Sequence, residues 1–363
     1  MKINFIAPVK EISGYGEFAR NVISGLVSVG ADIKVQPIKI NNDSDGLIDQ
    51  SLIGRHSKPD ACIICTVPTL AQQFRHPSSK NILYTMWEAS RLPEAWAEPC
   101  NKMDQVWVPS KHNVELFSKA LKVPVLYAPP PLALSKLDGI VRPQRSVESP
   151  FVFYSIFQWT ERKNPSGLIR AYWAAFTGQD DVVLRIKAYI RNPLSNELAQ
   201  INAEISNLKR AVRLRHYPKI EVIGQPMTSQ EIIQFHLDGD CFVSATRGEG
   251  LGLGLIEAMA LGTTCIASET SGHLDFAREN CHSVRTTQSP TFGMGDYAPW
   301  YTGDMMWDDV DLGRLTSSFK EARKQRHSGS QTFEKLARED VVRIYDPLIN
   351  SRTLLTFCSG QIE

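Results

Sequence analysis

One stretch of the sequence, residues 247–268, constrains the fold more than any other, and it reads RGEGLGLGLIEAMALGTTCIAS. Two acids, Glu249 and Glu257, stand on either side of a glycine-rich turn, which leads into an apolar helical pattern and then a strand pattern. The glycines of the turn have no side chains, so backbone N–H groups can approach a ligand closely. A glycine turn before a helix N-terminus suits an anion, because unpaired N–H groups and the helix dipole point the same way. Two acids beside such a turn suit a ligand with both hydroxyls and phosphates, and a sugar nucleotide has both.

The length and composition indicate a globular protein of two domains. With 363 residues, of which 42% are hydrophobic and 22% charged, the chain is too long for one ordinary core. No apolar run approaches the roughly twenty residues that a membrane-spanning helix needs, and the N-terminal run is too short for a secretory signal. The net charge of +1 gives no strong case for a nucleic-acid or membrane partner. Seven cysteines at scattered positions predict free thiols in a cytoplasmic protein, most of them in the core.

Short apolar runs alternate with helical patterns along the whole chain, and this alternation predicts a parallel α/β fold. In the first half, strands are expected at 3–7, 33–37, 61–67, 81–86, 105–109 and 123–128, and helices at 16–29 and 112–121. In the second half, strands are expected at 151–156, 182–188, 219–223, 241–245 and 263–267, and helices at 165–176, 195–212, 229–238, 254–261 and 310–324. The proline-rich stretch 129–150 is unsuited to a regular element. We therefore expect a first domain at 1–135, a linker at 136–150, a second domain at 151–330 and a helical tail at 331–363, broken at Pro347.

The run E-G-x-G-L-x-x-x-E-A-M-A-x-G, followed by a strand, resembles the E-x7-E signature of retaining glycosyltransferases with the GT-B fold, most closely glycosyltransferase family 4. The resemblance covers most of the chain. It implies two Rossmann-like parallel-sheet domains that face each other across a cleft, with the nucleotide-sugar donor at the carboxyl ends of the strands. It also implies that the C-terminal helices pack back onto the first domain, and the tail 331–363 is a candidate for that crossing.

By the same resemblance, residues 155–176 form the first strand, loop and helix of the donor domain, and they read SIFQWTERKNPSGLIRAYWAAF. Lys163 matches the lysine that binds the donor diphosphate. The family usually has an arginine five residues earlier, where this chain has Gln158, so Arg162 is the candidate for the missing charge. Cations are needed because a nucleoside diphosphate leaves with additional negative charge. The alternative is that Arg162 and Lys163 are ordinary charges on a solvated loop.

The resemblance also assigns the two acids of the signature. Glu249 is expected at the hydroxyls of the transferred sugar, and Glu257 at the ribose hydroxyls, which a carboxylate accepts well. Glu249 and Lys163 are therefore the expected catalytic residues. The remaining donor-binding candidates act through their backbones: Gly250, Leu251 and Gly252 near the sugar, and Ile223 and Gly224 near the base.

Two further regions are weaker candidates. Gly14 and Gly16 lie between the first strand and the first helix, where the family's loop approaches the donor phosphates and the acceptor; a tight turn that needs glycine is the alternative. On the acceptor side, many relatives have a histidine after the fourth strand, whereas this chain has Trp87 and Glu88. Trp87 also fits a core or cleft-wall position. His273 is a candidate for the acceptor mouth, and a structural or exposed histidine is the alternative.

No D-x-D pair stands between two strands where it would hold a metal-bound diphosphate. Asp238 and Asp240 fit a turn, and Asp309 and Asp311 fit the first turn of a helix. We therefore expect no metal and no cofactor besides the donor substrate, with Lys163 and the loop dipoles in the place of the metal. The resemblance implies attack from the same face as the leaving group, with the leaving phosphate as the base.

The base, the sugar, the acceptor and the oligomeric state stay open at this point. We favour a hydroxyl group on a glycan or a small molecule as the acceptor. A run of basic residues at 209–219 permits a second hypothesis, modification of hydroxymethylated bases in DNA, although the end of an exposed helix explains the run as well. A third hypothesis is a sugar-nucleotide-binding protein without catalysis, which Gln158 and the absent histidine leave open.

Overall fold

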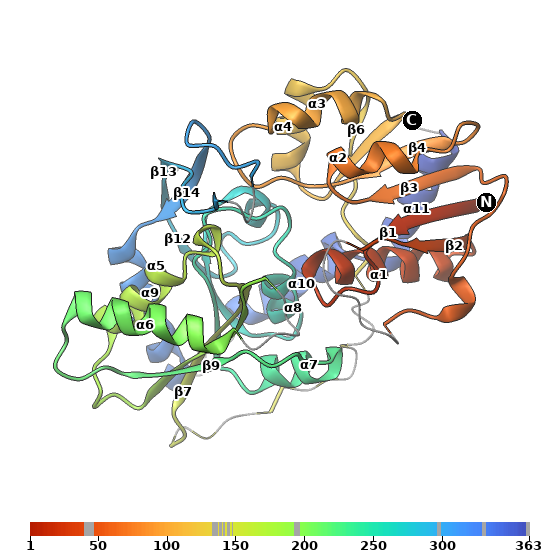
Figure 1. The fold of residues 1–363 in the computed structure, drawn as a ribbon. Helices are drawn as coiled ribbons and strands as arrows, with labels where there is room; N and C mark the ends of the chain where they lie inside the picture. Colours follow the sequence, from red (N-terminus) through yellow and green to blue (C-terminus); the bar gives the residue numbers. More distant parts are fainter. Residues whose placement is uncertain are drawn as a thin grey trace. The chain divides into compact units, whose positions relative to one another are not determined.

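The computed structural model describes residues 1–39, 47–132, 137, 140, 142–143, 146, 148–191, 197–295, 299–328 and 332–360. It divides the chain into two compact units (Figure 1). The first unit consists of Met1–Asp138 together with Val342–Glu363, and the second consists of Gly139–Val341. The beginning and the end of the chain therefore belong to the same unit. Part of the expected linker, 136–150, lies outside the described residues.

The first unit is built on a parallel sheet of six strands in the order β2-β1-β3-β4-β5-β6. The central strands are buried almost throughout, which is typical of a parallel sheet with helices on both faces. The strands are β1 (Lys2–Ala7), β2 (Asp32–Pro37), β3 (Ala61–Cys65), β4 (Lys80–Tyr84), β5 (Gln105–Val108) and β6 (Val125–Tyr127). The helices are α1 (Gly14–Ser28), α2 (Pro68–Ala71), α3 (Glu94–Asn101), α4 (Lys111–Ala120) and α11 (Pro347–Ser359), with short 3-10 helices η1 (Gln50–Leu52) and η2 (Gln72–Phe74).

The last helix of the chain, α11, packs against α1 in this unit. A Cβ at Gly25 of α1 would lie 2.4 Å from Oγ of Ser351 in α11, so the two helices approach this closely only because Gly25 has no side chain. Pro347 opens α11, where proline costs no hydrogen bond. Ser110 caps α4 by accepting a hydrogen bond from the N–H of Asn113, which confirms the predicted start of this helix.

The second unit is built on another parallel sheet of six strands, in the order β12-β11-β10-β7-β8-β9, with a separate antiparallel pair of β13 and β14. The strands are β7 (Phe151–Gln158), β8 (Val182–Tyr189), β9 (Lys219–Ile223), β10 (Cys241–Ser244), β11 (Thr264–Ser268), β12 (His282–Val284), β13 (Thr286–Pro290) and β14 (Met306–Val310). The helices are α5 (Pro165–Ala175), α6 (Leu198–Val212), α7 (Ser229–Leu237), α8 (Leu253–Ala260) and α9 (Leu312–Ser328), with η4 (Glu161–Lys163) and η5 (Ser271–Asp275). Helix α10 (Thr332–Ile344) contains the division between the two units.

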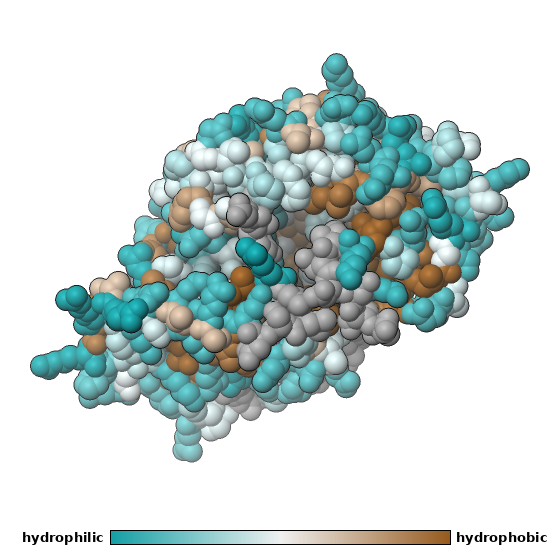
Figure 2. Space-filling model, viewed as in Figure 1, coloured by the Kyte–Doolittle hydropathy of each residue, from teal (hydrophilic) through white to brown (hydrophobic). Residues whose placement is uncertain are grey.

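Aromatic side chains fill much of the core of the second unit. The ring of Phe153 meets Tyr172 of α5 and Phe319 of α9 edge to face, with centroids 6.2 and 4.8 Å apart, an arrangement that stabilises beyond the buried area alone. All seven cysteines are free and buried, which confirms the predicted unpaired thiols. The face of the molecule in Figure 2 is mostly hydrophilic, with apolar residues in small groups. Of the helices in the described ranges, none is both long enough and apolar enough to cross a bilayer.

Most expected strands are present, but the sequence analysis did not predict β12, β13 and β14. The helix expected at 310–324 begins only at Leu312, because residues 306–310 pair with β13 instead. Asp309 lies in β14, so its interpretation as a helix N-terminal acid is wrong. Asp311 does cap α9, because its carboxylate accepts a hydrogen bond from the N–H of Arg314 at 2.9 Å.

Candidate active site

The loops after β7 and β10 lie next to each other at the carboxyl edge of the second sheet. These two strands are neighbours although β8 and β9 separate them in the sequence, so the strand order reverses between them. In open parallel sheets, such a reversal leaves a crevice beyond the carboxyl ends of the strands, and ligands bind there. The loop after β7 contains Lys163, and the loop after β10 contains Glu249.

The two predicted catalytic residues contact each other. Nζ of Lys163 donates a hydrogen bond to Oε1 of Glu249, and Nη1 of Arg162 lies 3.5 Å from the other carboxylate oxygen. Arg162 also donates to the carbonyl oxygen of Gly248 at 2.7 Å. The side chains of Arg162, Lys163 and Glu249 are only 14%, 18% and 10% exposed, so the three charges interact with little solvent between them.

These cations keep the carboxyl group of Glu249 ionised. Burial by itself raises the pKa of this group, but the attraction of Lys163 and then of Arg162 outweighs burial, and the pKa falls to about 2. At neutral pH the site therefore holds a carboxylate with two cations beside it. Such a cluster can bind hydroxyl groups through the carboxylate and phosphates through the cations.

The loop after β11 holds the backbone of Glu249. The N–H of Glu249 donates to Oγ of Ser271 at 2.7 Å, and its carbonyl oxygen accepts from the N–H of Gly272 at 2.9 Å. A Cβ at Gly272 would lie 2.7 Å from the carbonyl oxygen of Gly250, so this approach requires glycine. The sequence analysis missed this positioning contact, although it had singled out His273, in the same loop, for the acceptor mouth.

Arg247 ties several of these loops together, and it was not predicted. Its side chain is 8% exposed and forms an ion pair with Asp309 of β14 at 2.6 Å. It also donates to the carbonyl oxygen of Glu161, and its guanidinium lies 4.9 Å from the ring centroid of Phe292 and 5.3 Å from that of Trp307. A planar guanidinium with several fixed partners is well suited to hold loops in one arrangement.

Helix α8 begins directly after the glycine turn. Gly252 has a φ of 94°, in the left-handed region, and has no side chain to cap the first turn of the helix. A Cβ at Gly252 would lie 2.8 Å from the imidazole of His273. His273 is fully buried, so the alternative of an exposed histidine is wrong. Its Nδ1 lies 3.2 Å from the carbonyl oxygen of Ser268. Its Nε2 has no hydrogen-bond partner in the described part of the chain. Burial lowers the pKa of His273, although the carboxylate of Glu249 acts in the opposite direction.

Glu257 projects from α8 with a carboxylate that solvent reaches. Its side chain is 32% exposed, and Oε2 lies 3.5 Å from Nε2 of His236 in α7. His236 is buried and shares a hydrogen bond with the phenol of Tyr154 at 3.0 Å. Ile223 ends β9 and Gly224 follows it, at the same edge of the sheet. The contacts of these residues with ribose and base stay predictions.

Gln158 has a structural contact. Its Nε2 donates to the carbonyl oxygen of Ile190 at 3.0 Å, just beyond the end of β8. Arg162, in contrast, faces the carboxylate of Glu249. Of these two residues, only Arg162 therefore contacts the loop that contains Glu249.

The candidates of the first unit form a separate group on their own sheet. Gly16 is buried, and a Cβ there would lie 2.4 Å from the carbonyl oxygen of Glu11, so this position requires glycine, although it lies in the first turn of α1 and not in a tight turn. Gly14 has open space around it. Trp87 is 2% exposed and donates from its indole N–H to a backbone carbonyl oxygen at 2.7 Å, as a core residue does, whereas Glu88 is half-buried.

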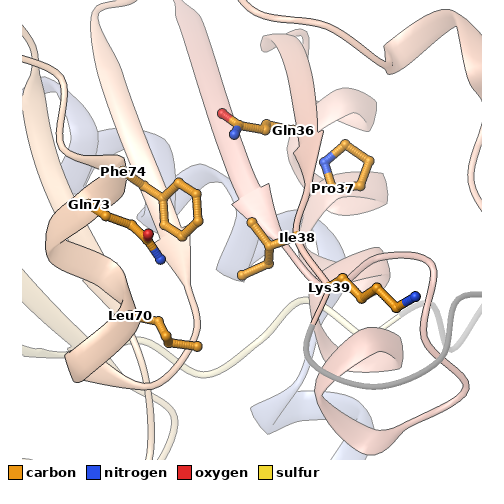
Figure 3. A pocket seen from close by; sticks show the side chains of 7 residues that line it. All are labelled: Gln36, Pro37, Ile38, Lys39, Leu70, Gln73 and Phe74. Carbon is orange, nitrogen blue, oxygen red and sulfur yellow. The ribbon is translucent and has the colours of Figure 1, made fainter.

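Two surface cavities lie away from these candidates. In the first unit, a cavity of about 290 Å³ at the end of β2 (Figure 3) is lined by Gln36, Pro37, Ile38, Lys39, Leu70, Gln73 and Phe74. In the second unit, a cavity of about 510 Å³ is lined by Glu269, Ser283, Arg285, Asp311 and Arg314. The lining of neither cavity includes a predicted site residue.

Metal ligation has no geometric support within the residues that the structure covers, where no group of three or more His, Cys, Asp or Glu side chains is placed to hold an ion. Asp238 ends α7, and Asp240 accepts a hydrogen bond from the N–H of Val152 at 2.8 Å, which confirms that both belong to a turn.

The basic run at 209–219 begins in the last turn of α6, where Lys209 and Arg210 lie, and Arg213 ends the helix in the left-handed conformation. The predicted helix end is therefore confirmed.

Residues 140–284, which contain Lys163, Glu249 and Glu257, match the family model described as glycosyl transferases group 1. No curated protein matches the sequence. The sucrose-phosphate synthase of Thermosynechococcus elongatus is similar in structure, with a TM-score of 0.74 and 14% identity over 99% of both chains. HepE of Anabaena, solved with UDP and glucose, has a TM-score of 0.67 and 14% identity over 99% of this chain and 100% of its own.

TarM of S. aureus is similar over 82% of this chain, with a TM-score of 0.57 and 12% identity. The chain spans about half the length of TarM, since the match covers 55% of that protein. At these identities, the similarity to solved structures shows the fold. The chain thus has the GT-B fold, as the sequence predicted, and its residues 140–284 match the glycosyl transferases group 1 family.

Proposed function

We propose that the chain is a retaining, metal-independent glycosyltransferase that moves a hexose or a pentose from a nucleoside diphosphate sugar to a hydroxyl group. The family match of residues 140–284 supports this reaction class. The observation that carries the proposal is the buried contact of Glu249 with Lys163 and Arg162, beside the uncapped first turn of α8. One acid and two cations at a helix N-terminus suit the hydroxyls and phosphates of a sugar diphosphate.

In this proposal, each group of the donor has its own partner. Lys163 and Arg162 bind the diphosphate, Glu249 accepts hydrogen bonds from the transferred sugar, and Glu257 accepts them from the ribose. The backbones of Gly250, Leu251, Gly252, Ile223 and Gly224 complete the donor site. HepE was solved with UDP and with UDP-glucose, so uridine donors are the first to test.

The transfer step needs no nucleophile from the protein. The bond between the anomeric carbon and the oxygen of the β-phosphate breaks, and the acceptor oxygen bonds to the same carbon from the same face. The proton of the acceptor hydroxyl passes to the leaving phosphate oxygen. Lys163 and Arg162 stabilise the charge that develops on the diphosphate, and Glu249 holds both cations in place before the donor arrives.

The acceptor that we favour is a glycan or a small molecule. The small net charge supports this choice over DNA, because a DNA-binding surface needs a broad basic stripe. We also infer that the protein acts in the cytoplasm, since all seven cysteines are free. Trp87, Glu88 and His273 are the candidates for the acceptor side, with Trp87 as a supporting core residue, and Gly14 and Gly16 stay candidates for donor binding.

A thermal-shift screen of UDP-, GDP-, ADP- and TDP-sugars tests the donor part of the proposal. A ligand that binds only the native state raises the melting temperature with the logarithm of its concentration, so one nucleotide series should raise it. A transfer assay with the donor thus identified then follows. No shift with any nucleotide sugar would contradict the proposal, and a shift without turnover on any acceptor would favour a binding protein without catalysis.

Chelation tests the metal-independent part. Because fixed cations take the place of a metal, transfer should continue at full rate in EDTA. Activity that EDTA abolishes and that manganese or magnesium restores would contradict this part of the proposal. It would not contradict the proposed donor site.

A further inference from the structure

Lys187, on β8, is a buried cation that the proposed reaction does not yet use. The residue is only 6% exposed, although lysine is almost never buried without a partner. No residue within the described ranges offers its ammonium group a hydrogen bond or an ion pair. Burial lowers the pKa of Lys187, and no neighbouring charge contributes.

Strand pairing fixes the place of Lys187 in the sheet. It lies opposite Ile156 of β7 on one side and opposite Ile223 of β9 on the other. Paired residues of parallel strands present their side chains on the same face, so Lys187 shares a face with Ile156 and, two residues earlier on β7, with Tyr154. Lys187 is therefore one strand away from Ile223, the residue expected beside the base.

Helices α7 and α8 cover this face of the sheet. Tyr154 hydrogen-bonds to His236 of α7, and a Cβ at Gly254, in the first turn of α8, would lie 3.9 Å from the carbonyl oxygen of Ile156. Lys187 is paired with Ile156, so it lies on the strand next to the one that the first turn of α8 approaches. That N-terminus has no side-chain cap and favours a negative group.

A buried ammonium group without an anion is unfavourable, and an anionic ligand relieves the cost. We propose that Lys187 binds a phosphate of the donor nucleotide, as a third cation in addition to Lys163 and Arg162. This inference rests on the proposed function, because it takes a nucleoside diphosphate sugar as the ligand. It explains why the protein keeps a lysine at a strand position where an apolar residue would be more stable.

The variant Lys187→Met removes the charge and keeps the length of the side chain. Its matched control is Lys219→Met, which is on β9 on the same face but at the amino end, and which is exposed and paired with Glu221 at 2.7 Å. Calorimetry with UDP, GDP and ADP, and with the corresponding nucleosides, gives the affinities of both variants. Lys187→Met should bind the preferred diphosphate about tenfold more weakly or worse, should bind the nucleoside as before, and should melt no lower than the wild type. Lys219→Met should bind both ligands as the wild type does.

Wild-type affinity of Lys187→Met for the diphosphate would overturn the inference, and so would equal losses for diphosphate and nucleoside. If the methionine variant does not fold, judged by circular dichroism, the same comparison is made with Lys187→Gln. Diphosphate binding that depends on Lys187 in a protein that transfers no sugar would support the phosphate site and reject the proposed reaction. A wild type that binds none of the three diphosphates overturns both.

Discussion

The carboxyl edges of the two sheets are built alike but carry different chemistry. Each sheet has six parallel strands and one reversal of strand order, between β1 and β3 in the first sheet and between β7 and β10 in the second. At the first edge, the phenol of Tyr15 shares a hydrogen bond with Thr85 at 3.1 Å, and burial raises the pKa of Tyr15. At the second edge, Lys163 and Arg162 contact an ionised Glu249. The contact between Tyr15 and Thr85 is thus neutral, whereas the contact at the second edge joins one carboxylate to two cations.

This difference separates what the architecture provides from what the side chains provide. A reversal of strand order opens a crevice in both sheets, so architecture alone would allow a site in either. Neutral hydrogen bonds are cheap to bury, whereas a buried ion pair stabilises a fold no better than well-packed apolar residues of the same volume would. A cluster of three buried charges is therefore better explained by ligand binding than by folding, and it supports our proposal that the second edge is the reactive one.

The largest expected effect comes from the acid of the second edge. Glu249→Gln should lower turnover by roughly a hundredfold or more, because it removes a preorganised charge from the reacting centre. The affinity for the nucleoside diphosphate should stay the same or increase, since Lys163 then has no competing carboxylate. Steady-state kinetics and calorimetry measure the two quantities.

Glu88→Gln is the control from the first edge, and it should reduce turnover much less than Glu249→Gln. Equal losses of turnover in the two variants would contradict the proposed difference between the edges, because the first edge would then contribute to the reaction as strongly as the second. Wild-type turnover in Glu249→Gln would remove this residue from the site.

The second effect concerns acid stability. The pKa of Glu249 is about 2 in the folded protein, below its ordinary value of 4.5. Between these values the unfolded chain binds more protons, so the stabilisation from this group is complete above 4.5 and is lost as the pH falls toward 2. At roughly 1.4 kcal/mol per pKa unit, the loss amounts to at most about 3.5 kcal/mol. Urea unfolding of the wild type and of Glu249→Gln across pH 6 to pH 3 should show their free energies of unfolding converging toward low pH, and parallel curves would contradict the ion cluster.

The third effect separates phosphate binding from base binding. Lys163→Ala should weaken binding of the nucleoside diphosphate by about tenfold or more, since one charge-assisted contact is worth roughly 1.5–3 kcal/mol, and it should leave nucleoside binding unchanged. Lys10→Ala, in the loop after β1, is the matched change at the first edge and should affect neither ligand. Calorimetry with both ligands decides, and equal losses in Lys163→Ala would make Lys163 a structural charge.

The sequence pointed to residues of the second edge where the signal was local. Glu249 and Glu257 stand in one short signature, and a glycine turn before a helix is visible without any distant partner. Arg247 was missed because its partner Asp309 is 62 residues away, on a strand too short to show a period of two. Lys187 was missed because a lysine in a strand pattern is ordinarily taken as exposed, and only the packing of helices on both faces buries it.

The smallest expected effect concerns a basic region that lies outside both edges. The exposed end of α6 carries Arg210, Arg213 and Arg215, and none of them contacts the acids of the site in the described part of the chain. Replacing all three with glutamine should leave sugar transfer to the favoured acceptors unchanged, because a surface charge far from the reacting atoms contributes little. The same triple variant serves to test the hypothesis of a DNA acceptor.

If duplex DNA is the acceptor, its binding should weaken steeply between low and physiological salt, because each neutralised phosphate releases a counterion. The triple variant should then flatten the dependence of log K on log salt by up to about one unit per lost phosphate contact. Mobility shifts across a salt series, with unmodified and hydroxymethylated duplexes, measure both slopes. Tight, salt-sensitive binding that depends on these arginines would mean that a DNA acceptor binds at the end of α6. The reaction would then involve a third region besides the two sheet edges. We expect instead that neither duplex binds at low salt, since Lys219 is already paired with Glu221 and the remaining charges fit the solvated end of a helix.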